Sequence, residues 1–388
     1  MRLAPVALAL TLPLAARSSA YAQPRPTSGP LHAFLVTQLR LGTTQDLGAE
    51  PGSPVLELRR LRLGLRASAL GGALTGLVVV NANPLALELL DAWGEVALGR
   101  GHRLRVGLAK VSSTTYRMGA FSDLVFVDWA LVTRPFGTER QLGAELHNQR
   151  SGQSWEYALG LWHGSTARAA HGRGLADVYA EPVANLSDLR VGHGYDPPHP
   201  EVSGRLLWRG PAGPPRRLHV TAGLNAQYDL RPVEARDIRL LVAPEIALAR
   251  GPLHLEITAW LGLAEGTTRP GVGAVTGLLA EVHAELSPRV TLGLRYAQVD
   301  VSEALRDDAR ARAQRLSQQG PNDTREALTR RYALAGTLST EHEIGIALRV
   351  DVLPPFVRWQ TDLGWIQRHG DPSPHDEIRG RTQLQLAL

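Results

Sequence analysis

Hydrophobic and polar residues alternate along most of the chain with a period of two. In residues 60–66, arginine or glycine alternates with leucine at every step. Successive side chains of a β-strand point to opposite faces of a sheet, so the pattern indicates strands with one polar and one apolar face. Similar segments recur at 217–226, 253–261 and 289–296, and again at the very end of the chain. The sequence therefore predicts an all-β protein.

The alternation predicts sixteen strands, and most have about the 9–11 residues that a tilted strand needs to cross a bilayer. Residues 331–352 are long enough for two strands, but their apolar positions keep one phase, so one strand is the simpler interpretation. An even number suits a closed single-chain barrel, and eighteen is the alternative count. The expected ranges are 31–41, 55–69, 73–81, 86–98, 103–111, 140–148, 154–163, 202–209, 216–228, 237–249, 253–263, 275–286, 289–300, 331–352, 356–366 and 378–388.

The connections between these strands alternate in length. Segments such as 112–139, 164–201 and 301–330 are long, whereas 250–252 and 287–288 are short. Outer-membrane barrels have long extracellular loops and short periplasmic turns. The alternation therefore predicts a transmembrane antiparallel β-barrel with both ends of the chain on the periplasmic side.

The first 22 residues are predicted to be a secretory signal peptide. Arg2 precedes an apolar stretch at 3–16, and Ala20-Tyr21-Ala22 is a small-x-small cleavage site. Residues 23–388 would then form one barrel domain in the bacterial outer membrane, in contact with its lipid. No later stretch reaches the roughly 18 apolar residues of a membrane helix.

A soluble exported β protein is the competing interpretation of the same alternation. In that protein the leucine face would be a core and the arginine face would meet water. The export signal, the strand length and the alternation of connection lengths favour the membrane barrel, as does the strand-like end at 381–388. A non-conducting binding protein of this kind remains an alternative.

Composition excludes several kinds of chemistry. The chain has no cysteine, so it has no disulfide, thiol nucleophile or thiolate metal site. Its net charge is +5, and all of its basic residues except Lys110 are arginines. The arginines are spread along the chain, and only 5% of the residues are aromatic. This spread argues against a nucleic-acid partner. Catalytic and nucleotide-binding signatures are absent, so we predict neither catalytic residues nor a cofactor; an outer-membrane barrel enzyme remains an alternative.

Histidines gather in two predicted loops, at 164–201 and 367–377. They lack the spacing of metal ligands, so we interpret them as solvated side chains and predict no metal site.

In a barrel, the arginine-rich face lines the lumen, and arginines there outnumber acidic residues. A guanidinium group presents a fixed fork of donors that suits phosphate or carboxylate. One group of arginines has few acidic residues near it in the predicted strands, and we expect it to form an anion-attracting wall. This group is Arg60, Arg62, Arg66, Arg103 and Arg105.

The long connection 112–139 is unusually apolar for an extracellular loop, with Phe121, Phe126 and Trp129 among its residues. We expect it to fold into the barrel and narrow the pore; packing on the rim or on a neighbouring subunit is the alternative. A polar helix is expected at 302–316, solvated on all sides. The residues expected near the constriction are Arg117, Asp123, Asp128, Arg134 and Arg140.

Five segments carry a resemblance to a known family. They are 59–65, 91–95, 104–110, 121–143 and 358–360. With them the sequence resembles the phosphate-selective porin O and P family of Gram-negative outer membranes. The resemblance implies a sixteen-stranded, homotrimeric porin more strongly than phosphate selectivity, because phosphate-specific members concentrate many lysines and arginines at the constriction and entrance, whereas this chain has one lysine. The expected function is passive diffusion of small hydrophilic solutes with a weak preference for anions, including phosphate or other oxyanions.

Overall fold

A computed structural model describes most of the barrel. The predicted signal peptide and nearly all of the predicted loop 164–201 lie outside the described residues. These residues are 31–46, 54–83, 86–136, 140–148, 153–163, 200–211, 217–230, 239–265, 272–318, 329, 333, 336–370 and 375–388.

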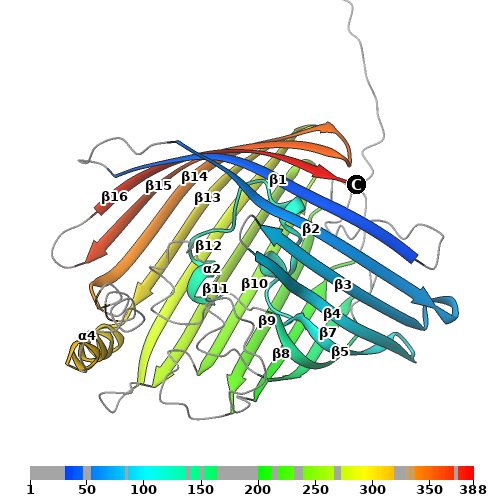
Figure 1. Ribbon diagram of the computed structural model, residues 1–388, viewed down its shortest axis with the longest axis horizontal. Helices are drawn as coiled ribbons and strands as arrows, with labels where there is room; N and C mark the ends of the chain where they lie inside the picture. Colours follow the sequence, from blue (N-terminus) through cyan, green and yellow to red (C-terminus); the bar gives the residue numbers. More distant parts are fainter. Residues whose placement is uncertain are drawn as a thin grey trace, which may run out of the picture.

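The described residues form sixteen strands in one closed antiparallel barrel, which confirms the predicted fold and strand number (Figure 1). Each strand pairs with its neighbours in the sequence, and the first pairs with the last. The strands are β1 Leu31–Asp46, β2 Val55–Ala69, β3 Leu74–Asn83, β4 Ala86–Gly99, β5 His102–Lys110, β6 Arg140–His147, β7 Trp155–Trp162, β8 Glu201–Arg209, β9 His219–Asp229, β10 Leu240–Arg250, β11 Leu253–Glu265, β12 Val272–Ser287, β13 Val290–Val301, β14 Leu338–Leu353, β15 Val357–Gly370 and β16 His375–Ala387.

The seam between β1 and β16 closes the barrel. The backbone groups of Leu35 and Leu388 exchange two hydrogen bonds of 2.9 Å each. In lipid each unpaired backbone N–H or C=O group costs several kcal/mol, which is a large part of the free energy of unfolding of a typical protein. An unpaired strand edge inside the membrane is therefore excluded. The alternating end of the chain is therefore a paired strand up to its last residue.

The two faces of the barrel differ as the alternation predicts. Large apolar side chains on the outer face are exposed, for example Leu294, Ile344 and Leu363. The intervening positions face inward, and Arg295 and Glu343 are buried there. An apolar outside around a polar inside is the distribution of a transmembrane barrel.

No helix among the described residues is long and apolar enough to cross a membrane.

The short connections are tight turns. Arg100 and Gly101 join β4 to β5, and both have positive φ, 50° and 91°. Two successive residues with positive φ are typical of a type I′ turn, whose twist matches that of the flanking strands. The antiparallel order puts successive connections at alternate ends of the barrel. At the other end, the β5–β6 and β13–β14 connections are long, as predicted, but only two residues separate β3 from β4.

The prediction of one strand over 331–352 is wrong at its start, since β14 begins at Leu338. Ala333 is helical, and Gly336 and Thr337 form a turn. Gly336 lies against the helix α4 (Glu303–Ser317): a Cβ added to Gly336 would come 2.5 Å from Cγ of Arg310. Packing of Gly336 against this helix keeps the preceding residues out of the strand, and the alternation of hydrophobic and polar residues does not reveal that packing.

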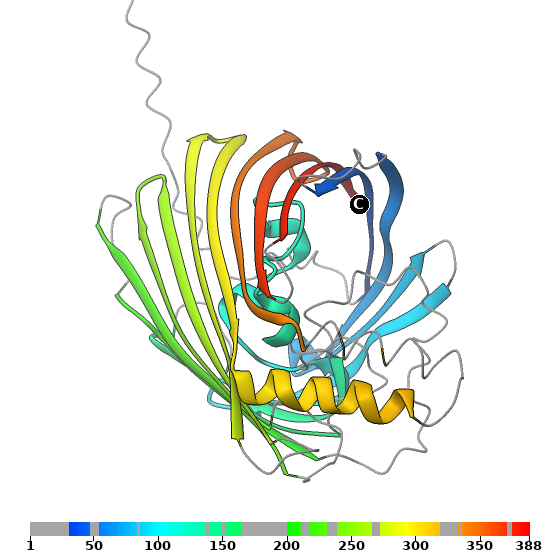
Figure 2. The same cartoon turned by 90° about the vertical axis from the view of Figure 1, so that its left-hand side faces the viewer.

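The helix α4 confirms the predicted helix, but it is not solvated on all sides. Leu305, Ala309 and Ala313 recur every four residues and are buried. Leu305 occupies the space above Gly273 of β12, where an added Cβ would come 2.3 Å from the leucine Cγ. The helix is thus fixed to the end of the barrel at which β13 ends and β14 begins (Figure 2). Its small apolar stripe is easily missed among its many charges.

The predicted last loop 367–377 is largely strand, because β15 extends to Gly370 and β16 begins at His375. His369 is therefore a strand residue.

An arginine on the outer face tests the membrane orientation. Leu294 lies in the middle of β13 and is 51% exposed, so we expect Leu294→Arg to lower the free energy of unfolding in lipid vesicles by about 2–4 kcal/mol. Leu286→Arg, near the end of β12, is the matched control and should cost about 0–1 kcal/mol. Denaturant titration of the vesicle-inserted barrel measures both, and equal costs would contradict the assigned outer face.

Candidate functional site

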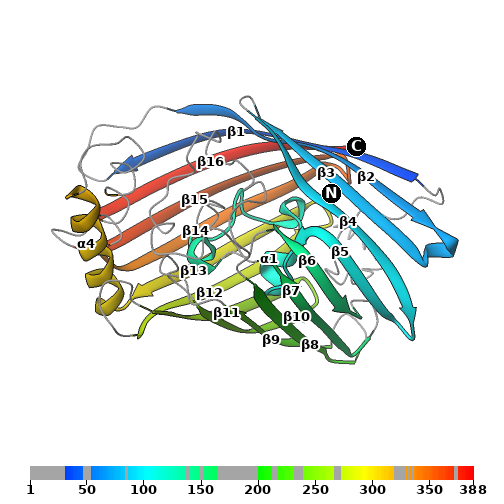
Figure 3. The same ribbon diagram turned by 60° about the horizontal axis from the view of Figure 1, so that its bottom comes forward.

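The connection between β5 and β6 lies inside the barrel (Figures 2 and 3). We call its described part, residues 111–136, the lumen loop. It contains two short helices, α1 (Thr115–Met118) and α2 (Thr133–Phe136), with the 3₁₀ turn η2 (Phe121–Asp123) between them. Its apolar side chains form a buried cluster with inner-wall residues of β10 to β15, including Leu241, Trp260, Leu279, Val299 and Ile366.

Glycines of the inner wall make room for the lumen loop. A Cβ added to Gly277 of β12 would come 2.4 Å from Cε2 of Phe136, and one added to Gly293 of β13 would come 2.9 Å from Cγ1 of Val125. Real Cβ atoms do not approach so closely, because interiors are packed to crystal density. The missing side chains therefore form the seat of the loop.

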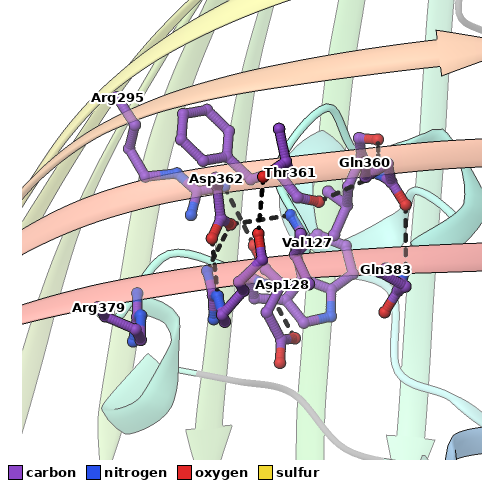
Figure 4. Close-up of polar contacts among 12 residues, drawn as sticks. Val127, Asp128, Arg295, Gln360, Thr361, Asp362, Arg379 and Gln383 are labelled. Atoms are coloured by element: carbon purple, nitrogen blue, oxygen red, sulfur yellow. Dashed lines mark hydrogen bonds and ion pairs between the residues drawn. The ribbon is translucent and has the colours of Figure 1, made fainter. Parts of the chain in front are cut away.

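Wall side chains also bind the backbone of the lumen loop (Figure 4). The N–H of Val127 donates to Asp362 at 3.0 Å, and the N–H of Leu131 donates to Glu343 at 2.7 Å. The Gln360 side-chain amide donates to the Leu124 carbonyl at 2.7 Å. Hydrogen bonds to charged groups are worth about 1.5–3 kcal/mol, so these contacts fix the loop without regular secondary structure.

Arg295 joins the wall to two parts of the lumen loop. It donates to Glu281 at 2.8 Å, to the Tyr116 hydroxyl at 2.9 Å and to the Asp128 carbonyl at 3.2 Å. Its guanidinium carbon lies 3.7 Å from the centroid of the Phe126 ring. Burial raises the pKa of Tyr116 well above its ordinary value, so the hydroxyl stays neutral.

Asp128 is the charged contact between the lumen loop and the opposite wall. Its carboxylate accepts from Arg40 at 3.0 Å, from Arg59 at 3.1 Å and, at a longer 3.5 Å, from Arg60. Burial alone would raise the pKa of Asp128, but the surrounding guanidinium groups hold it well below its usual range. The contribution of Asp128 to stability is thus complete above about pH 4 and is lost only as the pH falls through the lower native pKa.

Arg59 was not among the predicted site residues. The register between β1 and β2 shifts at Gln38/Leu39, where Gln38 pairs with Arg60 but Leu39 pairs with Leu58. Arg59 is the extra residue of this bulge, which turns its side chain inward beside that of Arg60. Strict alternation places Arg59 on the lipid face, and only the doubled Arg59-Arg60 hints at the irregularity.

The predicted arginine wall divides into two parts. The expectation of few nearby acids is wrong for Arg103 and Arg105, which bind Glu95 at 3.0 and 2.9 Å. Arg60 reaches Asp128, as described above. Arg62 donates to the neutral amide of Asn81 at 3.5 Å. Arg66 makes neither a hydrogen bond nor an ion pair with any described residue.

Aromatic rings of the lumen loop lie against the cations. The guanidinium carbons of Arg60 and Arg62 are 3.5 and 4.9 Å from the Phe121 centroid. Lys110 and Arg117 lie 5.4 and 4.9 Å from the Trp129 centroid. Ring faces attract cations within about 6 Å, so these contacts help to hold the positive groups between the loop and β2–β5.

The other residues expected at the constriction are spread apart. The Asp123 carbonyl accepts from Arg349 at 3.1 Å. Arg134 is in α2, but its side chain lies outside the described residues. Arg140 is the first residue of β6 and pairs with Asp91 at 3.0 Å.

Comparison with known proteins shows the fold. No family model and no curated protein matches the chain. The anion-selective porin from Comamonas acidovorans has a TM-score of 0.60 at 10% identity, over 92% of this chain and 99% of that chain. The high-pH structure of OprB of Pseudomonas putida has a TM-score of 0.58 at 9% identity, over 92% of this chain and 94% of that chain. The outer membrane channel DcaP of Acinetobacter baumannii has a TM-score of 0.54 at 10% identity, over 93% of this chain and 99% of that chain.

These neighbours place the chain among barrels with the porin fold. The resemblance to the phosphate-selective O and P family is not confirmed by them.

Adding one carbon at Gly277 tests the seat of the lumen loop. We expect Gly277→Ala to displace the loop, because the new Cβ would overlap Phe136 and Val132, and to raise single-channel conductance in planar bilayers. Gly364→Ala is the matched control: its Cβ would have no neighbour closer than 3.9 Å, so the conductance should stay that of the wild type. Gly277→Ala with wild-type conductance would show that the loop does not limit the pore.

Neutralising Asp128 tests its charge balance. Asp128→Asn leaves three guanidinium groups facing a neutral amide, so we expect the chloride-to-potassium permeability ratio to rise about twofold. Asp300→Asn on β13 makes the same charge change on the outer face, in phase with the exposed Leu294, and should leave the ratio unchanged. The factor between the ratios of Asp128→Asn and the wild type should be constant from pH 8 down to about pH 4, because Asp128 stays ionised and the other titrating groups are common to both proteins. A factor that shrinks already near pH 6 would contradict the lowered pKa.

Proposed function

We propose that this protein is a bacterial outer-membrane porin that lets small hydrophilic solutes diffuse passively, with a weak preference for anions. The observation that carries the proposal is the charge left on the β2 wall. Arg66 is partly exposed on the lumen side and has no ion-pair or hydrogen-bond partner among the described residues. Glu95 is the acidic group that acts on Arg66 from a distance, but Arg103 and Arg105 already pair with it, so this part of the wall keeps an excess of positive charge. An excess of positive charge on the lumen wall lowers the electrostatic cost of an anion's passage.

The weakness of the preference follows from the pairing elsewhere. Arg103 and Arg105 share Glu95, and Arg140 is paired with Asp91. Paired charges of opposite sign largely cancel at the distance of a passing solute. Arg66 itself lies on β2, which contributes no residue to the apolar cluster of the lumen loop.

The finer substrate class is an oxyanion such as phosphate or a carboxylate. A guanidinium group binds such groups with two parallel hydrogen bonds, which chloride cannot use. The sequence resemblance to phosphate-selective porins and the anion-selective neighbour of similar fold support this class. Export by the signal peptide, homotrimeric assembly and a lumen narrowed by residues 112–139 are further parts of the proposal.

Replacing Arg66 tests the proposed function. In planar bilayers, we expect the wild type to conduct with a chloride-to-potassium permeability ratio above one. We expect Arg66→Gln to lower that ratio about two- to threefold, because two charges about 7 Å apart in water interact by about 0.6 kcal/mol. Arg250→Gln removes the same charge at the exposed end of β10 and is the control.

Cation selectivity of the wild type would refute the anion preference. A folded barrel without conductance would instead favour the binding-protein alternative, and lipid or peptide hydrolysis by the wild type would favour an enzyme.

A further inference from the structure

A polar group stands out on the outer face of the barrel, near the extracellular ends of β13, β14 and β15. Tyr296, Gln298 and Asp300 alternate along β13 in phase with the exposed Leu294. In register, Gln298 pairs with His342 of β14, and Asp300 pairs with Thr340. Thr340 pairs with His369 of β15 in turn. These six residues, which we call the rim network, occupy positions where most of the outer face is leucine or isoleucine.

Hydrogen bonds run through the rim network in one direction. The carboxylate of Asp300 can only accept, and it receives the Thr340 hydroxyl at 2.8 Å and the Gln298 side-chain amide at 2.6 Å. The remaining oxygen atom of Gln298 must then accept the Tyr296 hydroxyl, at 2.8 Å. The tyrosine has a single hydrogen and has now used it.

This direction determines the tautomer of His342. Its Nδ1 lies 3.1 Å from the Tyr296 oxygen, which has no hydrogen left to give. Nδ1–H is therefore the donor, and the neutral ring keeps its lone pair on Nε2. Donation of the second ring N–H to an oxygen is the arrangement that orients metal-binding histidines and raises their basicity.

The ring of His369 lies beside that of His342. Their centroids are 5.8 Å apart and the planes are inclined at 83°. Two imidazoles sharing one zinc ion at Zn–N distances of about 2.0–2.1 Å have centroids roughly 5–6 Å apart. Both rings are only partly buried, so an ion and its water ligands can reach them.

We propose that His342 and His369 bind one divalent transition-metal ion at the extracellular rim of the barrel. Imidazole nitrogen favours Zn²⁺, Ni²⁺ and Cu²⁺ over Mg²⁺ or Ca²⁺. No set of three histidine, aspartate or glutamate side chains is in ligating geometry among the described residues, so water completes the coordination and the site exchanges its ion readily. Tyr296 is a positioning residue, which acts on the ion through His342.

The test uses the full-length protein without a histidine tag, purified in detergent and treated with chelator. Calorimetric titration with Ni²⁺ at pH 7.5 should show a site that is lost in His342→Gln and in His369→Gln. Tyr296→Phe should weaken this site about tenfold, because the second ring nitrogen of His342 loses its acceptor. Lowering the pH to 5.5 should weaken it too, because protons compete for the imidazoles.

His102→Gln is the matched control. His102 has the same contact with a tyrosine, 2.7 Å from Nδ1 to the hydroxyl oxygen of Tyr157, but among the described residues its ring contacts that tyrosine and no histidine. The His102→Gln variant should therefore bind Ni²⁺ with the affinity of the wild type.

Equal Ni²⁺ binding by the wild type and by the variant lacking both His342 and His369 would overturn the proposal. Absence of Ni²⁺ binding in the wild type would overturn it as well. The migration of unheated and heated samples in gels shows that each variant is a folded barrel.

Discussion

Closure of the sheet is the constraint on which the rest of this structure depends. Lipid offers no partner for a backbone N–H or C=O group, so each strand must be paired on both sides. The β1–β16 seam meets this requirement with the last residue of the chain, Leu388, bonded to Leu35. Once the ring is closed, the alternation assigns every side chain to lipid or lumen, and only irregularities of the sheet can change that assignment.

Inside the ring, the two halves of the wall have different roles. The half from β10 to β15 carries Leu279, Val299 and Ile366 inward and is covered by the lumen loop. The half formed by β1–β6 carries arginines, several of them paired with Glu95, Asp91 or Asp128. The loop therefore packs on one side of the lumen, and Asp128 connects it to the arginines of the other side.

Strand number, strand position and the direction of most side chains could be predicted from the sequence, because a period of two is a direct consequence of the pleat. The inward turn of Arg59 could not, since a bulge of one residue leaves no trace in composition. The partners of Arg103 and Arg105 depend on cross-strand register, which pairs both arginines with β4. The start of β14 was missed because alternation continued by chance into a turn that packs on α4.

The apolar inner wall has a consequence for how the barrel reaches its final form. On the outside, leucines leave water when the sheet enters the membrane, and they need no protein partner there. In the lumen, water remains, so apolar side chains can leave it only by packing on other parts of the protein, as Phe136 does on Trp260. Burial of the lumen loop is thus a globular folding step enclosed in a membrane protein. Because its seat is assembled from Gly277, Gly293 and their neighbouring strands, this step must follow the pairing of those strands.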